Sequence, residues 1–177
     1  MKLKFNPNQQ YQLDAINAVV SVFEGQPKQD SAFEYSIEEK DSLLQIAGVA
    51  NKLILSEEQL LINLKEVQKT NGVPESSSLS GTNFSVEMET GTGKTYVYLR
   101  TIYELNESYG FKKFVIVVPS VAIREGVLKN LQITHDHFQN LFDKTSLNFS
   151  VYNSSKVSQL RGFATGNNIE VLVINID

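Results

Sequence analysis

The residues best suited to chemistry in this sequence lie in one short glycine-rich segment. Residues 87–95 read Glu-Met-Glu-Thr-Gly-Thr-Gly-Lys-Thr, after a strand-like run and before a helix-like one. Gly91 and Gly93 allow the backbone to turn its N–H groups toward an anion, and a helix from Lys94 adds the positive end of its dipole. Lys94 can reach β- and γ-phosphates, and the Thr95 hydroxyl can bind Mg²⁺. The spacing predicts an ATP-binding loop, in which Lys94 and Thr95 are also candidate catalytic residues. The loop consists of Thr90, Gly91, Thr92, Gly93, Lys94 and Thr95.

One position departs from the general phosphate-loop pattern. Met88 stands five residues before Gly93, where that pattern has glycine. Helicase-like proteins tolerate another residue there, so the departure favours a helicase over a kinase. The competing interpretation is a strand-to-helix turn that binds nothing. The glycine spacing, the Lys-Thr pair and both flanking elements favour the phosphate loop instead.

A glutamine near the N-terminus is a candidate for recognising the base. Gln12 lies in the run Tyr-Gln-Leu-Asp-Ala-Ile, upstream of the loop, where superfamily 2 helicases have a glutamine that contacts adenine. A glutamine amide can donate to N7 of adenine and accept from its N6 amino group, which favours adenine over guanine. Phe5 is a weaker candidate for stacking on the base. Taken without the loop, Gln12 is better explained as a solvated helix residue.

The segment after the next apolar run offers candidate contacts to nucleic acid. It reads Val-Val-Pro-Ser-Val-Ala-Ile-Arg-Glu-Gly-Val over residues 117–127 and resembles the helicase motif that contacts the nucleic-acid backbone. Pro119 stops the strand, and Ser120 can cap the following helix while leaving N–H groups free for a phosphate. Arg124 can add a charged contact. The alternative is an ordinary strand-to-helix turn followed by a surface charge.

Composition limits the classes of protein that this chain can represent. Its 177 residues are 41% hydrophobic and 20% charged, which suits one globular domain with a real core. The absence of cysteine excludes a disulfide scaffold, a thiolate zinc site and a cysteine nucleophile. The net charge of −4 disfavours a freestanding domain that grips nucleic acid by charge alone. No apolar run approaches the roughly 20 residues of a membrane span, so we expect a soluble, cytoplasmic protein without a membrane partner.

The elements that position these residues alternate between strand and helix in the second half of the chain. Continuous apolar runs, above all 113–118, indicate strands buried on both faces of a parallel sheet, so the fold class is α/β with helices on both faces. Earlier, Asn8 is a plausible N-cap of a first helix, and Ser56 with Gln59 fits the capping box of another. The predicted strands are 83–88, 113–118, 148–152 and 169–176, and the predicted helices after the loop are 94–108 and 120–131.

This pattern divides the chain into three parts. Residues 1–27 form an N-terminal helix with the adenine motif, residues 28–81 a helical insertion and a linker, and residues 82–177 the ATP-binding core. The insertion shows no strand alternation, so we expect it to be helical and to lie before the strand that leads into the phosphate loop.

Taken together, these three motifs resemble the N-terminal motor region of the restriction subunit of type III restriction-modification enzymes. The resemblance covers most of the chain and is weakest over residues 28–81. It implies a RecA-like lobe of a helicase-like ATPase that uses ATP and Mg²⁺ and acts on double-stranded DNA. It also implies a separate nuclease domain that cuts DNA when partnered with a modification (methyltransferase) subunit, which reads the site and binds S-adenosylmethionine.

One element that the family needs is missing from the sequence. No Asp-Glu pair followed by two residues occurs to hold Mg²⁺ and position the attacking water, and Asp177 is only a weak substitute. The chain therefore resembles a fragment that is inactive alone and lacks the C-terminal part of its core. Two alternatives stay open: another superfamily 2 ATPase, such as a type I restriction motor or a repair helicase, or a non-catalytic nucleotide-binding module.

Overall fold

The structure of this chain is a computed structural model that describes residues 4–28, 33–37 and 46–176. The chain divides into two compact units. The first comprises Met1–Pro27 and Leu53–Ser108, and the second comprises Lys28–Lys52 and Tyr109–Asp177. No described helix is long and apolar enough to cross a membrane.

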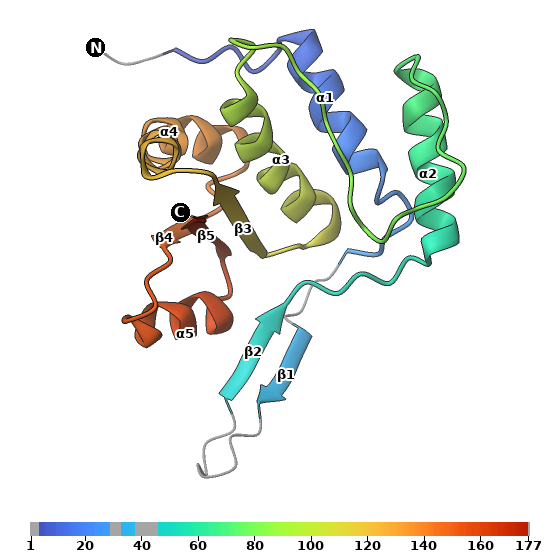
Figure 1. The fold of residues 1–177 in the computed structure, drawn as a ribbon. Coiled ribbons are helices and arrows are strands. Elements are labelled where there is room, and N and C mark those ends of the chain that lie inside the picture. The colour runs from blue at the N-terminus through green and yellow to red at the C-terminus, as the bar shows by residue number, and fades with distance from the viewer. Residues whose placement is uncertain (1–3, 29–32, 38–45, 177) are drawn as a thin grey trace. The chain divides into compact units, whose positions relative to one another are not determined.

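The first unit is built from three helices and the loops between them (Figure 1). These are α1 (Gln10–Ser21), α2 (Glu57–Thr70) and α3 (Lys94–Tyr109). The cap predicted for α2 is confirmed, because the Ser56 hydroxyl accepts a hydrogen bond from the Gln59 backbone N–H at 3.2 Å. The helix ends at Thr70 with Asn71 as its C-cap, and Gly72 follows with a positive φ of 65°. A left-handed residue just beyond a helix end favours glycine, which has no Cβ to clash.

A buried asparagine joins α2 to the end of α1. The last carbonyls of a helix have no partner within it and need an external donor. The Asn63 side chain supplies one, donating to the carbonyls of Val22 at 3.0 Å and Glu24 at 2.9 Å, and it accepts from Gln59 at 2.9 Å. Asn63 is 9% exposed, so these bonds satisfy an amide that water reaches poorly.

The second unit contains a parallel sheet and a hairpin. The sheet has the order β3-β5-β4 with all neighbours parallel; its strands are β3 (Lys113–Val118), β4 (Leu147–Val151) and β5 (Ile169–Asn175). The connecting helices α4 (Val121–Leu141) and α5 (Val157–Thr165) lie on opposite sides of these strands (Figure 1). The predicted α/β class, with a parallel sheet flanked by helices, is confirmed.

Burial within the sheet is uneven, and this corrects one prediction. Val171 and Val173 of the central strand β5 are 1% and 0% exposed. On β3, by contrast, Val115 and Val117 are 51% and 57% exposed. The expectation that residues 113–118 are buried on both faces is therefore wrong. β3 is at the edge of the three-stranded sheet, and the exposed side chains of Val115 and Val117 alternate along it with less exposed ones.

Two further predictions about strands were wrong. Residues 83–88, expected to be a strand, belong to no strand or helix, although they are described. Residues 28–81 are not entirely helical, because β1 (Phe33–Ile37) and β2 (Ile46–Ala50) form an antiparallel hairpin. The sequence Phe-Glu-Tyr-Ser-Ile of β1 alternates apolar and polar residues, which is the period of two typical of a strand.

Helix boundaries also differ from the expected ones. The N-cap of α1 is Gln9 rather than Asn8, and its side chain makes no capping hydrogen bond. Helix α4 runs to Leu141, ten residues beyond the predicted end at residue 131. Asp177, the possible Mg²⁺ ligand, lies outside the described residues.

Candidate nucleotide-binding site

The predicted phosphate loop lies in the first unit and leads directly into α3. Gly91 and Gly93 have φ values of 84° and 85°, in the left-handed region that favours glycine. Helix α3 begins at Lys94, and its first turn is closed by a hydrogen bond from the Val97 N–H to the Gly93 carbonyl at 3.0 Å. The first N–H groups of such a helix have no carbonyl partner within it, so they are available to an anion.

The backbone of the loop is held by its own side chains. The Glu89 carbonyl accepts two hydrogen bonds, from the Thr92 hydroxyl and from the Lys94 ammonium, both at 2.7 Å. Lys94 and Thr90 are exposed. The ammonium thus rests on a neutral carbonyl of the loop, and a phosphate there would offer it a stronger, charged acceptor.

Thr95, the candidate Mg²⁺ ligand, is half-buried on the first turn of α3. Burial raises the pKa of the Tyr98 phenol, and a hydrogen bond with Thr95 partly opposes that rise. The Thr95 side chain is therefore held near Tyr98, a neighbour that the sequence did not single out. Among the described residues there is no group of three or more His, Asp or Glu that could hold a metal ion.

Gln12 is brought to the loop from a point 80 residues earlier in the sequence. Its side-chain Nε2 donates to the Thr92 carbonyl at 2.9 Å, and the residue is 7% exposed. A Cβ added to Gly93 would lie 2.6 Å from the same nitrogen. The hydrogen bond to Thr92 uses the amide nitrogen of Gln12 and not its carbonyl oxygen.

The N-terminal residues pack on α3 beside this site. The ring of Phe5 stacks on Tyr96, with centroids 5.9 Å apart and an interplanar angle of 17°. Phe5, suggested as a base-stacking residue, therefore has an aromatic partner within the protein. Tyr96, an aromatic two residues after the loop lysine, is itself 8% exposed, which agrees with packing within the protein rather than stacking on a base.

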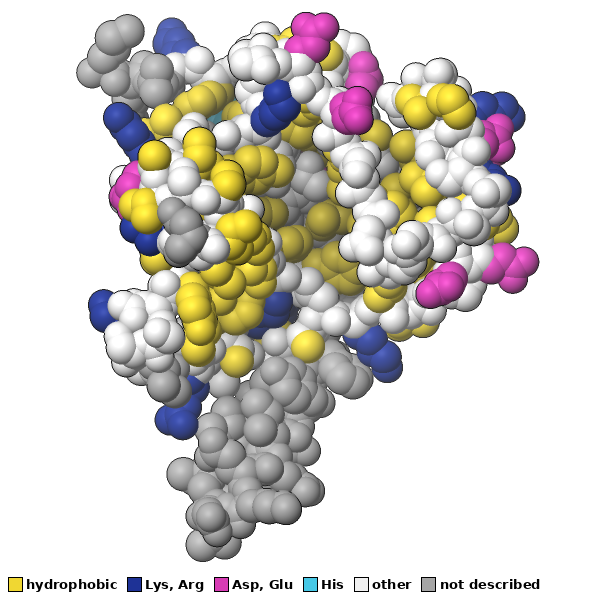
Figure 2. Space-filling view, in the orientation of Figure 1, with side chains coloured by type: hydrophobic (Ala, Val, Ile, Leu, Met, Phe, Trp, Pro, Cys, Tyr) yellow, Lys and Arg dark blue, Asp and Glu magenta, His cyan; other side chains and the backbone are white. Residues whose placement is uncertain are grey.

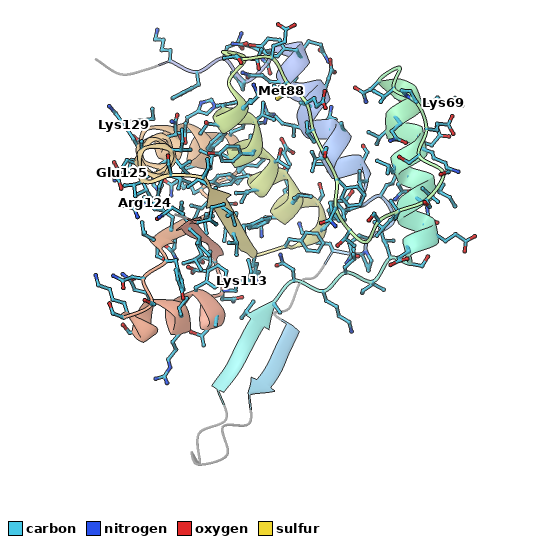
Figure 3. All side chains as sticks on the ribbon, in the orientation of Figure 1. Lys69, Met88, Lys113, Arg124, Glu125 and Lys129 are labelled. Carbon is cyan, nitrogen blue, oxygen red and sulfur yellow. The ribbon has the colours of Figure 1, made fainter. Side chains whose placement is uncertain are left out.

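The two candidate DNA contacts lie in the second unit. Ser120 is the N-cap of α4, where its hydroxyl accepts from the Ile123 N–H at 3.4 Å. Arg124 follows on the first turn, next to Glu125 (Figure 3). Its guanidinium donates to the Glu125 carboxylate at 2.9 Å and to the Asn175 side chain at 2.7 Å. The predicted cap is confirmed, but the charge of Arg124 is already paired with an adjacent acid.

Comparison with known proteins identifies the family. The sequence model of a family described as "Type III restriction enzyme, res subunit" matches residues 5–177. The chain belongs to this family. The RecA-like, helicase-type fold class that the motifs implied is thereby confirmed for the α/β architecture described above.

Individual members of this family show how much of a type III Res subunit the chain represents. It is 32% identical, over 97% of its length, to the EcoPI Res subunit of Escherichia phage P1, and it covers 19% of that protein. It is 40% identical to the EcoP15I Res subunit of Escherichia coli over 59% of the chain and 11% of that protein. To the StyLTI Res subunit of Salmonella typhimurium it is 49% identical over 41% of the chain and 8% of the protein. The chain thus spans a fifth or less of these relatives.

Proposed function

We propose that this chain is the ATP-binding N-terminal lobe of the DNA-translocating motor in a type III restriction endonuclease. The observation that carries the proposal is the loop of residues 90–95, in which two glycines with positive φ precede a helix that begins at the loop lysine. Backbone N–H groups, the helix dipole and one ammonium then converge on a single anion site. The family match supports the same conclusion for the motor region of a restriction enzyme.

Each residue of the loop has a distinct part in this proposal. Gly91 and Gly93 shape the backbone around the phosphates, and Lys94 exchanges the Glu89 carbonyl for the β- and γ-phosphates. Thr95 offers a hydroxyl oxygen to Mg²⁺, a hard cation that prefers oxygen ligands and keeps several waters or phosphate oxygens. Magnesium, when bound, neutralises charge on the phosphates. Thr90 and Thr92 complete the loop. The Thr92 carbonyl also accepts the hydrogen bond that positions the Gln12 side chain.

Gln12 is proposed to read the base. Its Nε2 donates one hydrogen to Thr92 and retains a second for N7 of adenine. Its carbonyl oxygen can accept from the N6 amino group, whereas the O6 of guanine would face it as a second acceptor. Adenine is thereby favoured over guanine.

The wider activity is proposed for the whole protein rather than for this lobe. It comprises ATP-dependent translocation and cleavage of double-stranded DNA in the cytoplasm, together with a modification subunit. Ser120 and Arg124 are proposed to face the DNA backbone, but the Arg124–Glu125 pair reduces the charge that this surface can offer. We expect the lobe alone to bind duplex DNA weakly and in a salt-sensitive way. Submicromolar affinity at physiological salt, measured by fluorescence anisotropy, would contradict this expectation.

Nucleotide binding by the chain is the direct test of the proposed function. Titration of fluorescently labelled ATP with Mg²⁺ should show one saturable site. Lys94→Met should weaken binding strongly, whereas Lys129→Met, an exposed lysine on α4, should leave it unchanged. Absence of saturable binding, or equal affinity in Lys94→Met, would reject the proposed function.

A further inference from the structure

Arg100 is a nearly buried cation on the helix that follows the phosphate loop. Its side chain is 11% exposed. Its Nε lies 3.1 Å from the carboxylate of Glu104, one helical turn further along α3. A buried guanidinium is costly unless its charge is paired and its N–H groups are satisfied. Glu104 supplies the charge, and the remaining donors are directed elsewhere.

Those donors hold the segment that leads into α1. Arg100 Nη1 donates to the carbonyl of Pro7 at 2.6 Å, a contact between residues 93 positions apart. Arg100 also lies at Tyr96, since its charge and a hydrogen bond to the phenol oppose the rise that burial causes in the pKa of Tyr96. Phe5 stacks on that same tyrosine. One patch of α3 therefore fixes both Phe5 and Pro7.

The start of α1 depends on this attachment. Its N-cap, Gln9, makes no side-chain capping bond, so the helix does not fix its own first turn in the usual way. Gln12 lies in that first turn and reaches the Thr92 carbonyl at 2.9 Å. The N-terminal end of α1 is thus held at two points, through Arg100 to α3 and through Gln12 to the phosphate loop.

We infer that Arg100 is a positioning residue for base selectivity: by fixing Pro7 it places the Gln12 amide where adenine is read. This inference rests on the proposed nucleotide site and adds a residue outside the loop to it. Because Arg100 acts through Gln12, its loss reduces the part of the affinity that depends on the base. The part that depends on the triphosphate is retained, since the hydrogen bonds described for Arg100 go to Glu104, Pro7 and Tyr96 and not to Lys94 or the loop backbone.

The test compares ATP with GTP in the presence of Mg²⁺, by calorimetric titration of the chain. Arg100→Met should lower the ratio of ATP affinity to GTP affinity roughly fivefold, the effect of about one hydrogen bond, while GTP affinity stays the same. Arg100→Lys keeps a donor for Pro7 but loses the planar fork that also serves Glu104, so an intermediate ratio is expected. Glu107→Gln, at an exposed position on the same helix, is the matched control and should retain the wild-type ratio.

A second pair of variants separates positioning from a structural role. Gln12→Ala should abolish selectivity, and Arg100→Met should then have no further effect on the ratio in that background. A merely structural Arg100 would weaken ATP and GTP equally, which would overturn the inference, as would a wild-type protein without base preference. If Arg100→Met does not fold, as judged by circular dichroism, Arg100→Lys decides the question by the same ratio. Failure of wild-type binding, or its insensitivity to Lys94→Met, instead rejects the nucleotide site itself.

Discussion

The two units of this chain differ in how their candidate functional residues are held. In the first unit, Gln12 and Arg100 donate to backbone carbonyls 80 and 93 residues away, and both contacts converge on the loop and its helix. In the second unit, Arg124 donates to its own neighbour Glu125 and to Asn175. Distant parts of the chain therefore fix the geometry of the loop, whereas Arg124 combines a contact to its sequence neighbour with one to Asn175, 51 residues away.

The two units also differ in net charge. The first unit has six Lys and Arg against ten Asp and Glu, and the second has ten of each, so the net charge of −4 resides in the first. Figure 2 shows acidic and basic side chains mixed over α2, whereas basic ones predominate around α5. An anion site in an acidic unit must depend on local donors rather than on a general positive field. Lys94 and the N–H groups of the loop are those donors.

Replacing one cation in each unit should give the largest difference in ATP affinity between two variants. Lys94→Met should weaken ATP at least about 30-fold, because a charge-assisted hydrogen bond to phosphate contributes roughly 2 kcal/mol. Arg124→Met in the second unit should leave ATP affinity unchanged. Both are measured by nucleotide titration, and a comparable loss in Arg124→Met would break the assignment of the site to the first unit.

The two loop glycines should respond differently to alanine. Both have positive φ, so each substitution carries a backbone cost of about 1–2 kcal/mol. A Cβ on Gly91 meets nothing within 4 Å, whereas a Cβ on Gly93 would lie 2.6 Å from the Gln12 amide nitrogen. Gly93→Ala should therefore also lower the ratio of ATP to GTP affinity, and Gly91→Ala should not. Equal ratios in the two variants would show that Gln12 is not located by the loop.

Within the first unit, stability should depend on the amide that joins its helices. Asn63→Ala removes the donors to the carbonyls of Val22 and Glu24 and should lower the free energy of unfolding by roughly 2 kcal/mol. Asn17→Ala, at an exposed position on α1, is the control and should change it by less than about 0.5 kcal/mol. Urea unfolding followed by circular dichroism measures both, and equal effects would contradict the role of Asn63.

Alkaline pH should change the contributions of two partly buried groups, one in each unit, in opposite directions. Burial raises the pKa of Tyr103 on α3 to about 12, so its stabilising effect is complete below pH 10 and is lost as the pH rises toward 12. Burial lowers the pKa of Lys113 on β3, although the charge of Glu170 opposes this. Because the unfolded chain then binds more protons at this lysine, its contribution to stability increases as the pH rises. Tyr103→Phe should flatten the loss of unfolding free energy between pH 9 and 11.5. An unchanged slope would show that Tyr103 does not contribute to it.

The sequence allowed the loop and two of the three proposed capping residues, Ser56 and Ser120 but not Asn8, to be predicted; it did not reveal the contacts that connect distant elements. Ser56 with Gln59 and the Gly91–Gly93 spacing are local signals, and both predictions about local structure agree with the geometry. Whether residues 83–88 form a strand depends on a partner strand, which a local pattern cannot reveal. Arg100 gave no signal at all, because its importance comes from its contact with Pro7, which lies before α1 and 93 residues away in the sequence.

Hydrogen–deuterium exchange of the chain with and without Mg²⁺ and ATP tests the central claim most directly. If the backbone of the phosphate loop binds the nucleotide, amides of residues 90–96 should exchange more slowly in its presence, and those of β5 should keep their rates. Protection should disappear in Lys94→Met. Unchanged exchange across residues 90–96 at saturating ATP, or protection confined to the second unit, would contradict the account.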